Sequence, residues 1–218
     1  MHKVMVLIGA MTGLRRPAGQ AKWDADRVRT ALSLPGLRRM VRNRVQESVR
    51  RDHVLASTHL VAAVDELWFD TEPVLDDFDK LLRPTATVAV LQTSLVREHV
   101  VFRRPVGDKP YIKRLSLLQR RAGLSPHEFS RYWEHVHAPL AHCHRHVSLY
   151  VQNHALSSSQ AAPLLFDGIA EFHITDLAAM QADYATEQGI AMRADVANFA
   201  STVSTYVVIA QEFPCALG

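Results

Sequence analysis

The feature that most constrains the fold of this chain is an internal repeat, spaced by about half of its 218 residues. Three pairs of segments match in the same order: 40–45 with 150–155, 64–78 with 169–183, and 96–102 with 203–209. Each match is weak, but chance is a poor explanation for the shared order. The repeat indicates that one structural unit occurs twice in the chain.

The second half has the clearer pattern of secondary structure. Ser125 is a good helix N-cap, Pro126 suits the first helical position and Glu128 completes a capping box. Pro139 predicts that this helix kinks or ends near His137. Strands are predicted at 111–121, 146–156, 167–175 and 201–213, and a second helix at 177–186.

This order, β-α-β-β-α-β, is that of a ferredoxin-like unit. We therefore expect an α+β fold in which two ferredoxin-like modules in tandem pack sheet to sheet around one barrel. The expected domains are a degenerate N-terminal module at 1–105 and a C-terminal module at 110–218. Proline and glycine in the segment between them favour a linker.

The segment GLSPHEFSRYWEHVHAPL (123–140) resembles the EthD family of dimeric α+β barrel proteins. The similarity extends over about 111–213 and is faint in the first half of the chain. It implies a dimeric α+β barrel with both modules in one chain. Proteins of that superfamily include cofactor-free cyclases, isomerases and dehydratases, small monooxygenases and haem proteins, so the resemblance implies a fold more than a reaction. The residues that carry it are Gly123, Leu124, Ser125, Glu128, Phe129, Tyr132, Trp133, His137, Pro139 and Leu140.

Alternation along the predicted strands sorts their polar side chains into faces. Tyr150, Gln152 and His154 share one face of their strand, and Glu171 and His173 share one face of the next. A sheet face that carries helices must be apolar, so we expect both sets to line the barrel cavity. Imidazoles in such a cavity suit general acid–base catalysis near neutral pH.

The repeat supplies an internal control for the two strand histidines. The first copy has Arg44 where the second has His154, and Trp68 where the second has His173. Restriction to one copy favours a catalytic or substrate-binding function, and a hydrogen-bonded strand histidine is the alternative. Glu171 has a counterpart, Glu66, so a structural function common to both halves is its stronger interpretation.

Three residues of the predicted helix, Tyr132, Trp133 and His137, have no counterpart in the first half. His137 is a candidate acid or base at the mouth of the cavity, with hydrogen bonding to a freed helix carbonyl as the alternative. For Tyr132 and Trp133, substrate binding competes with ordinary core packing.

Six of the twelve histidines lie between 131 and 156. His142, His144 and His146 alternate on a connecting segment, and no HExxH or paired CxxC motif accompanies them. We expect these three to be surface histidines and predict neither a metal nor another cofactor.

Charge and apolar patterning exclude several classes of partner. The net charge of +3 comes with interleaved acids and no nucleic-acid motif, so we predict no nucleic-acid binding. The apolar run at 4–11 is far too short to span a bilayer, and two cysteines make no disulfide framework. These features predict a cytoplasmic protein without a membrane partner, either monomeric or a homodimer.

Together these observations predict a cofactor-independent lyase, dehydratase, isomerase or cyclase that acts on a hydrophobic carbonyl or phenolic small molecule. One alternative is a non-catalytic binding module for an apolar metabolite, and another is an oxygen- or haem-dependent oxidative barrel enzyme. The predicted catalytic residues are His137, His154 and His173, and the predicted substrate-binding residues are Tyr132, Trp133, Tyr150, Gln152 and Glu171.

Overall fold

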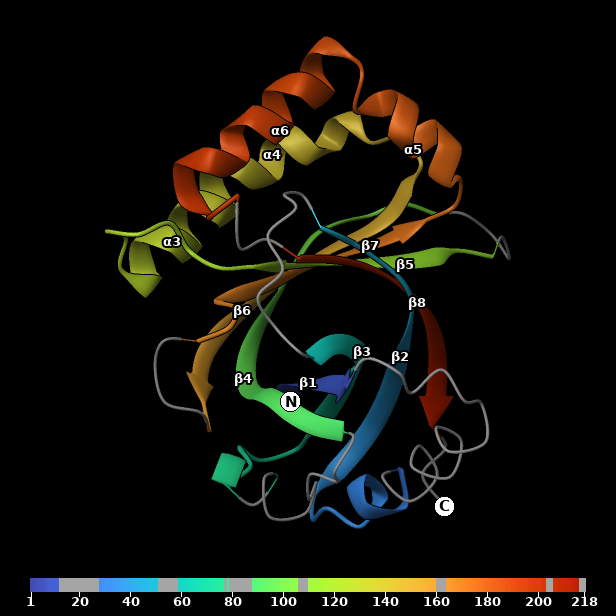
Figure 1. Ribbon diagram of the computed structural model, residues 1–218, viewed down its shortest axis with the longest axis vertical. Coiled ribbons are helices and arrows are strands. Elements are labelled where there is room, and N and C mark those ends of the chain that lie inside the picture. The colour runs from blue at the N-terminus through green and yellow to red at the C-terminus, as the bar shows by residue number, and fades with distance from the viewer. Residues whose placement is uncertain are drawn as a thin grey trace.

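The computed structural model describes residues 1–11, 28–50, 59–76, 78, 88–105, 110–159, 164–202 and 206–215. Within these ranges eight antiparallel strands close into a barrel (Figure 1), in the order β1-β3-β2-β8-β5-β7-β6-β4. The strands are β1 (His2–Met11), β2 (Leu37–Arg50), β3 (His59–Phe69), β4 (Val88–Arg103), β5 (Ile112–Leu118), β6 (Val147–Ser158), β7 (Gly168–Ile174) and β8 (Tyr206–Cys215).

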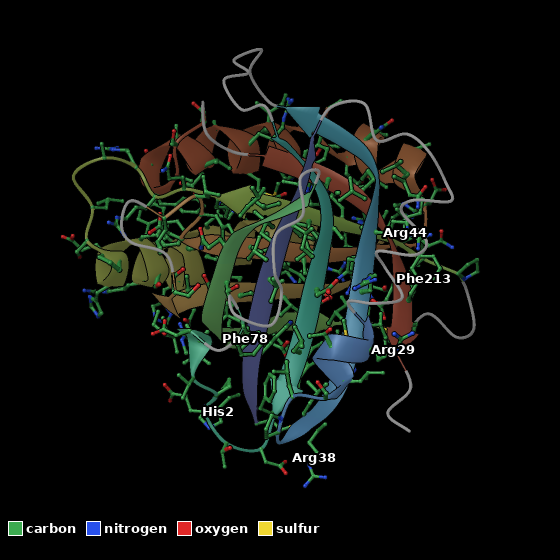
Figure 2. The ribbon with its side chains drawn as sticks, turned by 60° about the horizontal axis from the view of Figure 1, so that its bottom comes forward. His2, Arg29, Arg38, Arg44, Phe78 and Phe213 are labelled. Atoms are coloured by element: carbon green, nitrogen blue, oxygen red, sulfur yellow. The ribbon has the colours of Figure 1, made fainter. Side chains whose placement is uncertain are left out.

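The strands pair in the same manner in each half of the chain. β1 pairs with β3 and β4, and β3 pairs with β2; likewise β5 pairs with β7 and β8, and β7 pairs with β6. The halves join through β2–β8 and β4–β6. At the β2–β8 seam the Arg44 guanidinium lies 4.9 Å from the centre of the Phe213 ring (Figure 2). The predicted α+β barrel is confirmed, whereas the predicted linker at 106–109 lies outside the described residues.

Helices of the second half cover the outer face of β5–β8 (Figure 1). The predicted capping box is present, because Glu128 N donates to Ser125 Oγ (3.2 Å) and Ser125 N donates to Glu128 Oε2 (2.7 Å). The helical elements of the second half are α3 (Pro126–Tyr132), the π-helix η1 (Trp133–His137), α4 (Ala138–Leu140), the 3-10 helix η2 (Ala141–Cys143), α5 (Leu177–Asp183) and α6 (Glu187–Phe199).

The helix that begins at Pro126 does not end near His137. It widens into η1 instead, where Ala138 N donates to Trp133 O, five residues back. A π-turn is a known way for a helix to accommodate an irregularity, and it often occurs at functional sites. Pro139 then lies in α4, where it donates no backbone hydrogen bond.

The inside of the barrel is divided along its axis. Apolar side chains from both halves fill one end, and each such burial contributes roughly 1.5–3 kcal/mol. Charged side chains occupy the other end, around Lys3 and Lys113. No helix in the described part of the chain is long and apolar enough to cross a membrane. The apolar end consists of Met5, Leu7, Val64, Val96, Leu115, Leu117, Phe166, Ile169 and Val208.

Candidate active site and barrel-end cavity

The structure separates the predicted site residues into two places on opposite faces of the sheet. One is the pocket between β5–β7 and the helices, here called the sheet–helix pocket. The other is the cavity at the charged end of the barrel, here called the barrel-end cavity. Tyr132, Trp133, His137, Tyr150, Gln152 and His154 belong to the helix-covered side, whereas Glu171 and His173 line the barrel-end cavity.

The expectation that Tyr150, Gln152 and His154 line the barrel cavity is wrong. Trp133 Nε1 donates to the Tyr150 hydroxyl (3.0 Å), and Gln152 Nε2 donates to the Trp133 carbonyl (3.0 Å). A helix-covered sheet face can therefore carry polar groups, because these groups satisfy one another and the helix backbone. Their apolar neighbours Leu149 and Val151 line the cavity instead.

The sheet–helix pocket has aromatic walls. Trp133 is fully buried, and its ring lies so close to Gly168 that a Cβ there would be 2.4 Å from Trp133 Cζ3. Tyr150 stacks on Phe172 with ring centroids 4.4 Å apart, and burial raises the pKa of the Tyr150 phenol. The lining of this pocket is therefore largely aromatic.

His137 lies at the edge of this pocket, held by a carboxylate of α6. Its Nδ1 is 2.9 Å from Asp195 Oδ2, and its ring centroid is 4.7 Å from that of Phe199. Tyr132 and Asn198 donate to Asp195 Oδ1 over 2.7 and 2.9 Å. Although burial acts to raise the pKa of Asp195, these hydrogen bonds hold it below its ordinary value. The carboxylate thus stays ionised and orients the imidazole.

Sequence reasoning missed Asp195, because it did not predict α6 at all. An aspartate on a helix is usually solvent-exposed, so the residue type alone did not indicate that Asp195 belongs to a site. Asp176 and Thr186 cap α5 and α6 by accepting from Ala179 N (2.9 Å) and Gly189 N (3.1 Å), a pattern that could have divided the segment into two helices.

The space left inside the pocket is about 30 Å³, enough for a water or a dioxygen molecule. Arg114 lies at its side, with its guanidinium 5.5 Å from the Phe172 ring and 5.9 Å from the Tyr184 ring. The pocket is lined by Arg114, Ser116, Leu118, Trp133, His137, Tyr150, Ala170, Phe172, Tyr184, Met192, Val196 and Phe199.

His154 is buried beside Trp133, with ring centroids 4.6 Å apart and Nε2 3.2 Å from Gln152 Oε1. Burial lowers the pKa of His154 to about 3. The imidazole is therefore neutral and weakly basic at pH 7, which disfavours it as a general base.

The expectation of three surface histidines is wrong for His144, which is fully buried against Phe172 and Tyr184. Burial lowers its pKa to about 4. Among the described residues, no group of three or more His, Cys, Asp or Glu side chains is placed to hold a metal ion.

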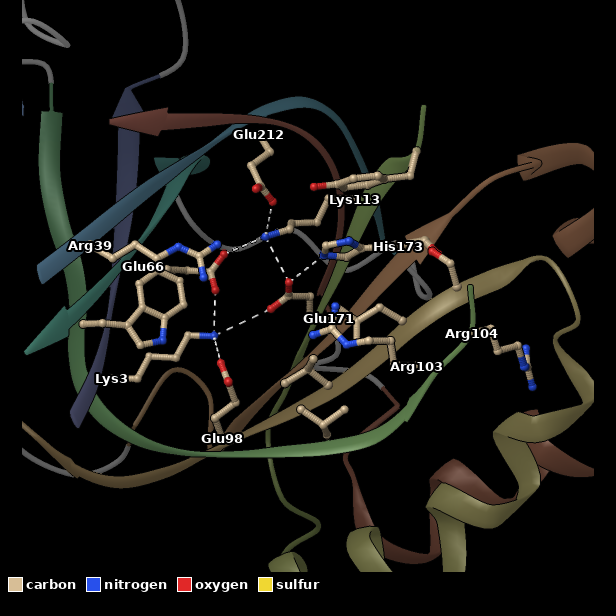
Figure 3. Close-up of a pocket in the computed structure, with 16 residues that line it drawn as sticks. Lys3, Arg39, Glu66, Glu98, Arg103, Arg104, Lys113, Glu171, His173 and Glu212 are labelled. Carbon is tan, nitrogen blue, oxygen red and sulfur yellow. Dashed lines mark hydrogen bonds and ion pairs between the residues drawn. The ribbon is translucent and has the colours of Figure 1, made fainter. Parts of the chain in front are cut away.

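The barrel-end cavity, about 340 Å³ in volume, surrounds a network of buried ion pairs (Figure 3). Lys113 Nζ lies 2.8 Å from Glu66, 3.0 Å from Glu171 and 2.7 Å from Glu212. Lys3 Nζ lies 2.7 Å from Glu66 and 2.6 Å from Glu98. Burial acts against the charged forms, yet the opposite charges keep the pKa of Lys113 raised and that of Glu171 well below its ordinary value.

His173 joins this network from β7. Its Nε2 is 2.8 Å from Glu171 Oε1, and its ring stacks on Tyr111 with centroids 4.2 Å apart. The prediction that Glu171 and His173 share a cavity face is confirmed. Sequence reasoning missed Lys3 and Lys113, although a lysine inside a predicted buried strand was a signal of internal ion pairing.

Comparison with known proteins identifies the fold. Residues 121–202 match the EthD domain. The solved structure of an anthrone oxidase-like protein superposes with a TM-score of 0.63 at 8% identity, covering 98% of this chain and 93% of that one. A "putative monooxygenase" from Lactobacillus acidophilus NCFM gives 0.52 at 8% identity, covering 100% and 98%. A "putative chlorite dismutase" gives 0.52 at 10% identity, covering 96% and 94%. No curated protein matches the chain.

The names of these three proteins are those of oxidative enzymes. The prediction of a cofactor-independent lyase, dehydratase, isomerase or cyclase is therefore wrong, and the oxidative alternative agrees better with them. At this low identity the structures themselves show a shared α+β barrel fold alone.

The haem form of the oxidative alternative does not fit the side chains as they stand in either place. In the sheet–helix pocket the rings of Trp133, Tyr150 and Phe172 leave about 30 Å³, so a porphyrin would have to displace many more side chains than a small aromatic molecule would. The barrel-end cavity has charged walls, and His173 Nε2 there is engaged with Glu171. A largely apolar macrocycle would desolvate these charges at high cost. The chain is therefore an eight-stranded α+β barrel in which residues 121–202 match the EthD domain.

Proposed function

We propose that this chain is an oxygen-dependent enzyme that oxidises an electron-rich aromatic or phenolic small molecule in the sheet–helix pocket. The observation that carries the proposal is the His137–Asp195 pair, 2.9 Å apart beside a pocket with aromatic walls. All residues of the pair and of the aromatic walls lie within the EthD domain. The oxidative names of proteins with the same fold support the reaction class.

In this proposal His137 moves protons, and Asp195 is a positioning residue that orients its ring and stabilises the imidazolium. Tyr132 and Asn198 hold Asp195 in place. Trp133, Tyr150 and Phe172 would contact the substrate. Arg114, at the side of the pocket, would attract a phenolate oxygen.

The proposed chemistry converts an activated CH₂ group and dioxygen into a carbonyl group and water. His137 removes one C–H proton, and the electron-rich carbanion bonds to dioxygen. The imidazolium returns its proton to the terminal oxygen, giving a hydroperoxide. His137 then takes the second C–H proton while the O–O bond breaks, and the departing hydroxide takes that proton as water.

The free space suits dioxygen, whereas an aromatic substrate needs more room. Met192 and Tyr184 line the pocket from the α5–α6 side, and we propose that they move aside for the substrate. Methionine adapts its shape at low cost, because its chain is unbranched and flexible.

Oxygen uptake by the full-length chain with anthrone as the probe tests this proposal. We expect uptake coupled one to one with anthraquinone formation, and a fall of about 10²–10⁴-fold in kcat for His137→Asn. His127→Asn is the matched control, because His127 is exposed on the same helix. Anthrone binding without oxygen uptake would instead support a non-catalytic binding module. Failure of anthrone and of simple polyphenols to bind or react would overturn both.

We also infer that the two halves are copies of one ferredoxin-like unit. The support is register: Lys3 pairs with Trp68 as Lys113 pairs with His173. Lys3 also pairs with Val96, and Lys113 pairs with Ala210, so Val96 and Ala210 occupy equivalent positions in the two halves. The sequence repeat instead matched position 96 with position 203, seven residues earlier.

A further inference from the structure

The barrel-end cavity lies on the face of the sheet opposite the sheet–helix pocket. At about 340 Å³ it falls within the range of roughly 300–1,000 Å³ seen for small-molecule sites. Its walls come from strands of both halves, so it is not a feature of the EthD domain alone (Figure 3). The function proposed above makes no use of it.

The inner part of the cavity has an excess of negative charge. Two cations, Lys3 and Lys113, face four carboxylates within 2.6–3.0 Å, which leaves two negative charges unbalanced. Glu66 and Glu171 are buried, whereas the side chains of Glu212 and Glu98 are 16% and 36% exposed, so solvent screens part of this excess. The four carboxylates are those of Glu66, Glu98, Glu171 and Glu212.

One atom of this network lacks a donor. Glu171 is only 4% exposed, and its Oε1 lies near both Lys113 Nζ (3.0 Å) and His173 Nε2 (2.8 Å). Its Oε2 accepts no hydrogen bond from any described residue, and Lys3 Nζ is 3.7 Å away. Buried charged acceptors are usually hydrogen-bonded, so this oxygen is a point at which a ligand or a water molecule can donate.

The mouth of the cavity has the opposite sign. Arg39 and Arg103 are exposed and line it, and neither forms an ion pair with an acid in the described ranges. Arg39 stacks on Trp68 at 4.4 Å instead. Arg104 differs, because its guanidinium donates to the backbone carbonyls of His144 and Val147.

A metal ion is a poor match for the inner charge. The ammonium groups of Lys3 and Lys113 already lie between the carboxylates, and no metal-binding group of three acids or histidines occurs in the described ranges. An ammonium group matches better, since it donates hydrogen bonds in a compact geometry. Carboxylates in the inner part of the cavity and arginines at its mouth together suit a ligand that carries one positive and one negative charge.

We propose that the barrel-end cavity binds a small zwitterion of the aminocarboxylate class. Its ammonium group donates to Glu171 Oε2, and its carboxylate pairs with Arg39 and Arg103. A ligand with one charge would satisfy one end only.

Isothermal titration of the full-length chain tests this proposal with glycine, 4-aminobutyrate and 6-aminohexanoate as zwitterions of increasing length. Butyrate and butylamine are the singly charged controls. We expect saturable binding of at least one zwitterion, with each control about 10-fold weaker or more, equivalent to about 1.4 kcal/mol. Saturation by no zwitterion, or equal binding of butyrate or butylamine, would overturn the proposal.

Variants locate the site. Arg103→Met should weaken the zwitterion about 10-fold or more, whereas Arg121→Met, at an exposed arginine outside the cavity, should not change it. Glu171→Gln should also weaken binding, and circular dichroism reports whether that variant still folds. Full affinity in Arg103→Met would contradict the proposal even if Glu171→Gln unfolds. Anthrone oxidation by the same samples tests the sheet–helix pocket separately.

Discussion

His137 Nδ1 and Asp195 Oδ2 lie 2.9 Å apart although 58 residues separate them in the chain. The contact joins η1 to α6 over the sheet, and the π-turn sets where His137 stands along the helix. Aspartate in this position fixes the tautomer and orientation of an imidazole, as in hydrolytic triads. The pair is therefore the part of the helix layer best suited to move a proton.

Asp195→Asn should lower kcat for anthrone oxidation about 10²-fold with little change in KM, because the substrate does not touch this carboxylate. Steady-state oxygen uptake between pH 5 and pH 9 measures kcat and KM. The pH profile of the variant should shift, because the imidazole of His137 loses its charged partner. Glu187→Gln, in the first turn of the same helix, is the control. An unchanged pH profile in Asp195→Asn would argue that Asp195 has a structural function only.

Gly168→Ala should destabilise the protein by about 1–3 kcal/mol, because the new Cβ would lie 2.4 Å from Trp133 Cζ3. Urea denaturation measures the loss. Trp133→Phe removes the ring atoms in question, so the double variant should lose less than the two single variants together. Additive losses would show that the close approach is not the cause.

Removal of a charge should lower the unfolding free energy most where that charge belongs to a buried ion pair. Lys113→Met should cost about 3–5 kcal/mol of unfolding free energy, since it leaves Glu66 and Glu171 short of a partner. The double variant Lys113→Met/Glu66→Gln should lose less unfolding free energy than the two single variants lose together. Arg121→Met is the exposed control, and chemical denaturation at pH 7 provides the comparison.

The same carboxylates predict an acid transition. Burial opposes ionisation, but Lys3 and Lys113 hold the pKa values of Glu66 and Glu171 below their unfolded values. Their contribution to stability is therefore complete above about pH 4.3 and is lost as the pH falls through the folded pKa values. Glu171→Gln should flatten the decline of unfolding free energy below pH 4.3. An unaltered slope would contradict this assignment.

Two buried histidines act in a higher pH range. Burial lowers the pKa of His154 to about 3 and that of His144 to about 4 in the folded protein. In the unfolded chain both histidines have a pKa of about 6.5, so below that pH the unfolded chain binds more protons than the folded protein does. Stability should therefore fall as the pH drops from 6.5 towards 4. His154→Gln should reduce that slope and His127→Gln should not, as unfolding at pH 7.5 and pH 5 would reveal. An imidazole of His154 that titrates by NMR between pH 5 and 8 would disprove the argument.

The sequence by itself determined the local features. The capping box at Ser125 and Glu128, the strands of the second half and the shared face of Glu171 and His173 follow from short-range rules, in which a side chain's effect reaches a few residues. The motif that carries the EthD resemblance likewise lies in one contiguous segment, 123–140. These features can be predicted from a short segment, without knowledge of the rest of the chain.

Only the tertiary structure decided which polar groups meet. Strand alternation could not say which face the helices cover, so Tyr150, Gln152 and His154 were expected in the wrong place. The partner of His137 comes from α6, and Lys3 meets Glu66 and Glu98 across strands distant in sequence. Barrel closure sets these meetings, because long-range strand pairing fixes the position of each side chain relative to its distant neighbours.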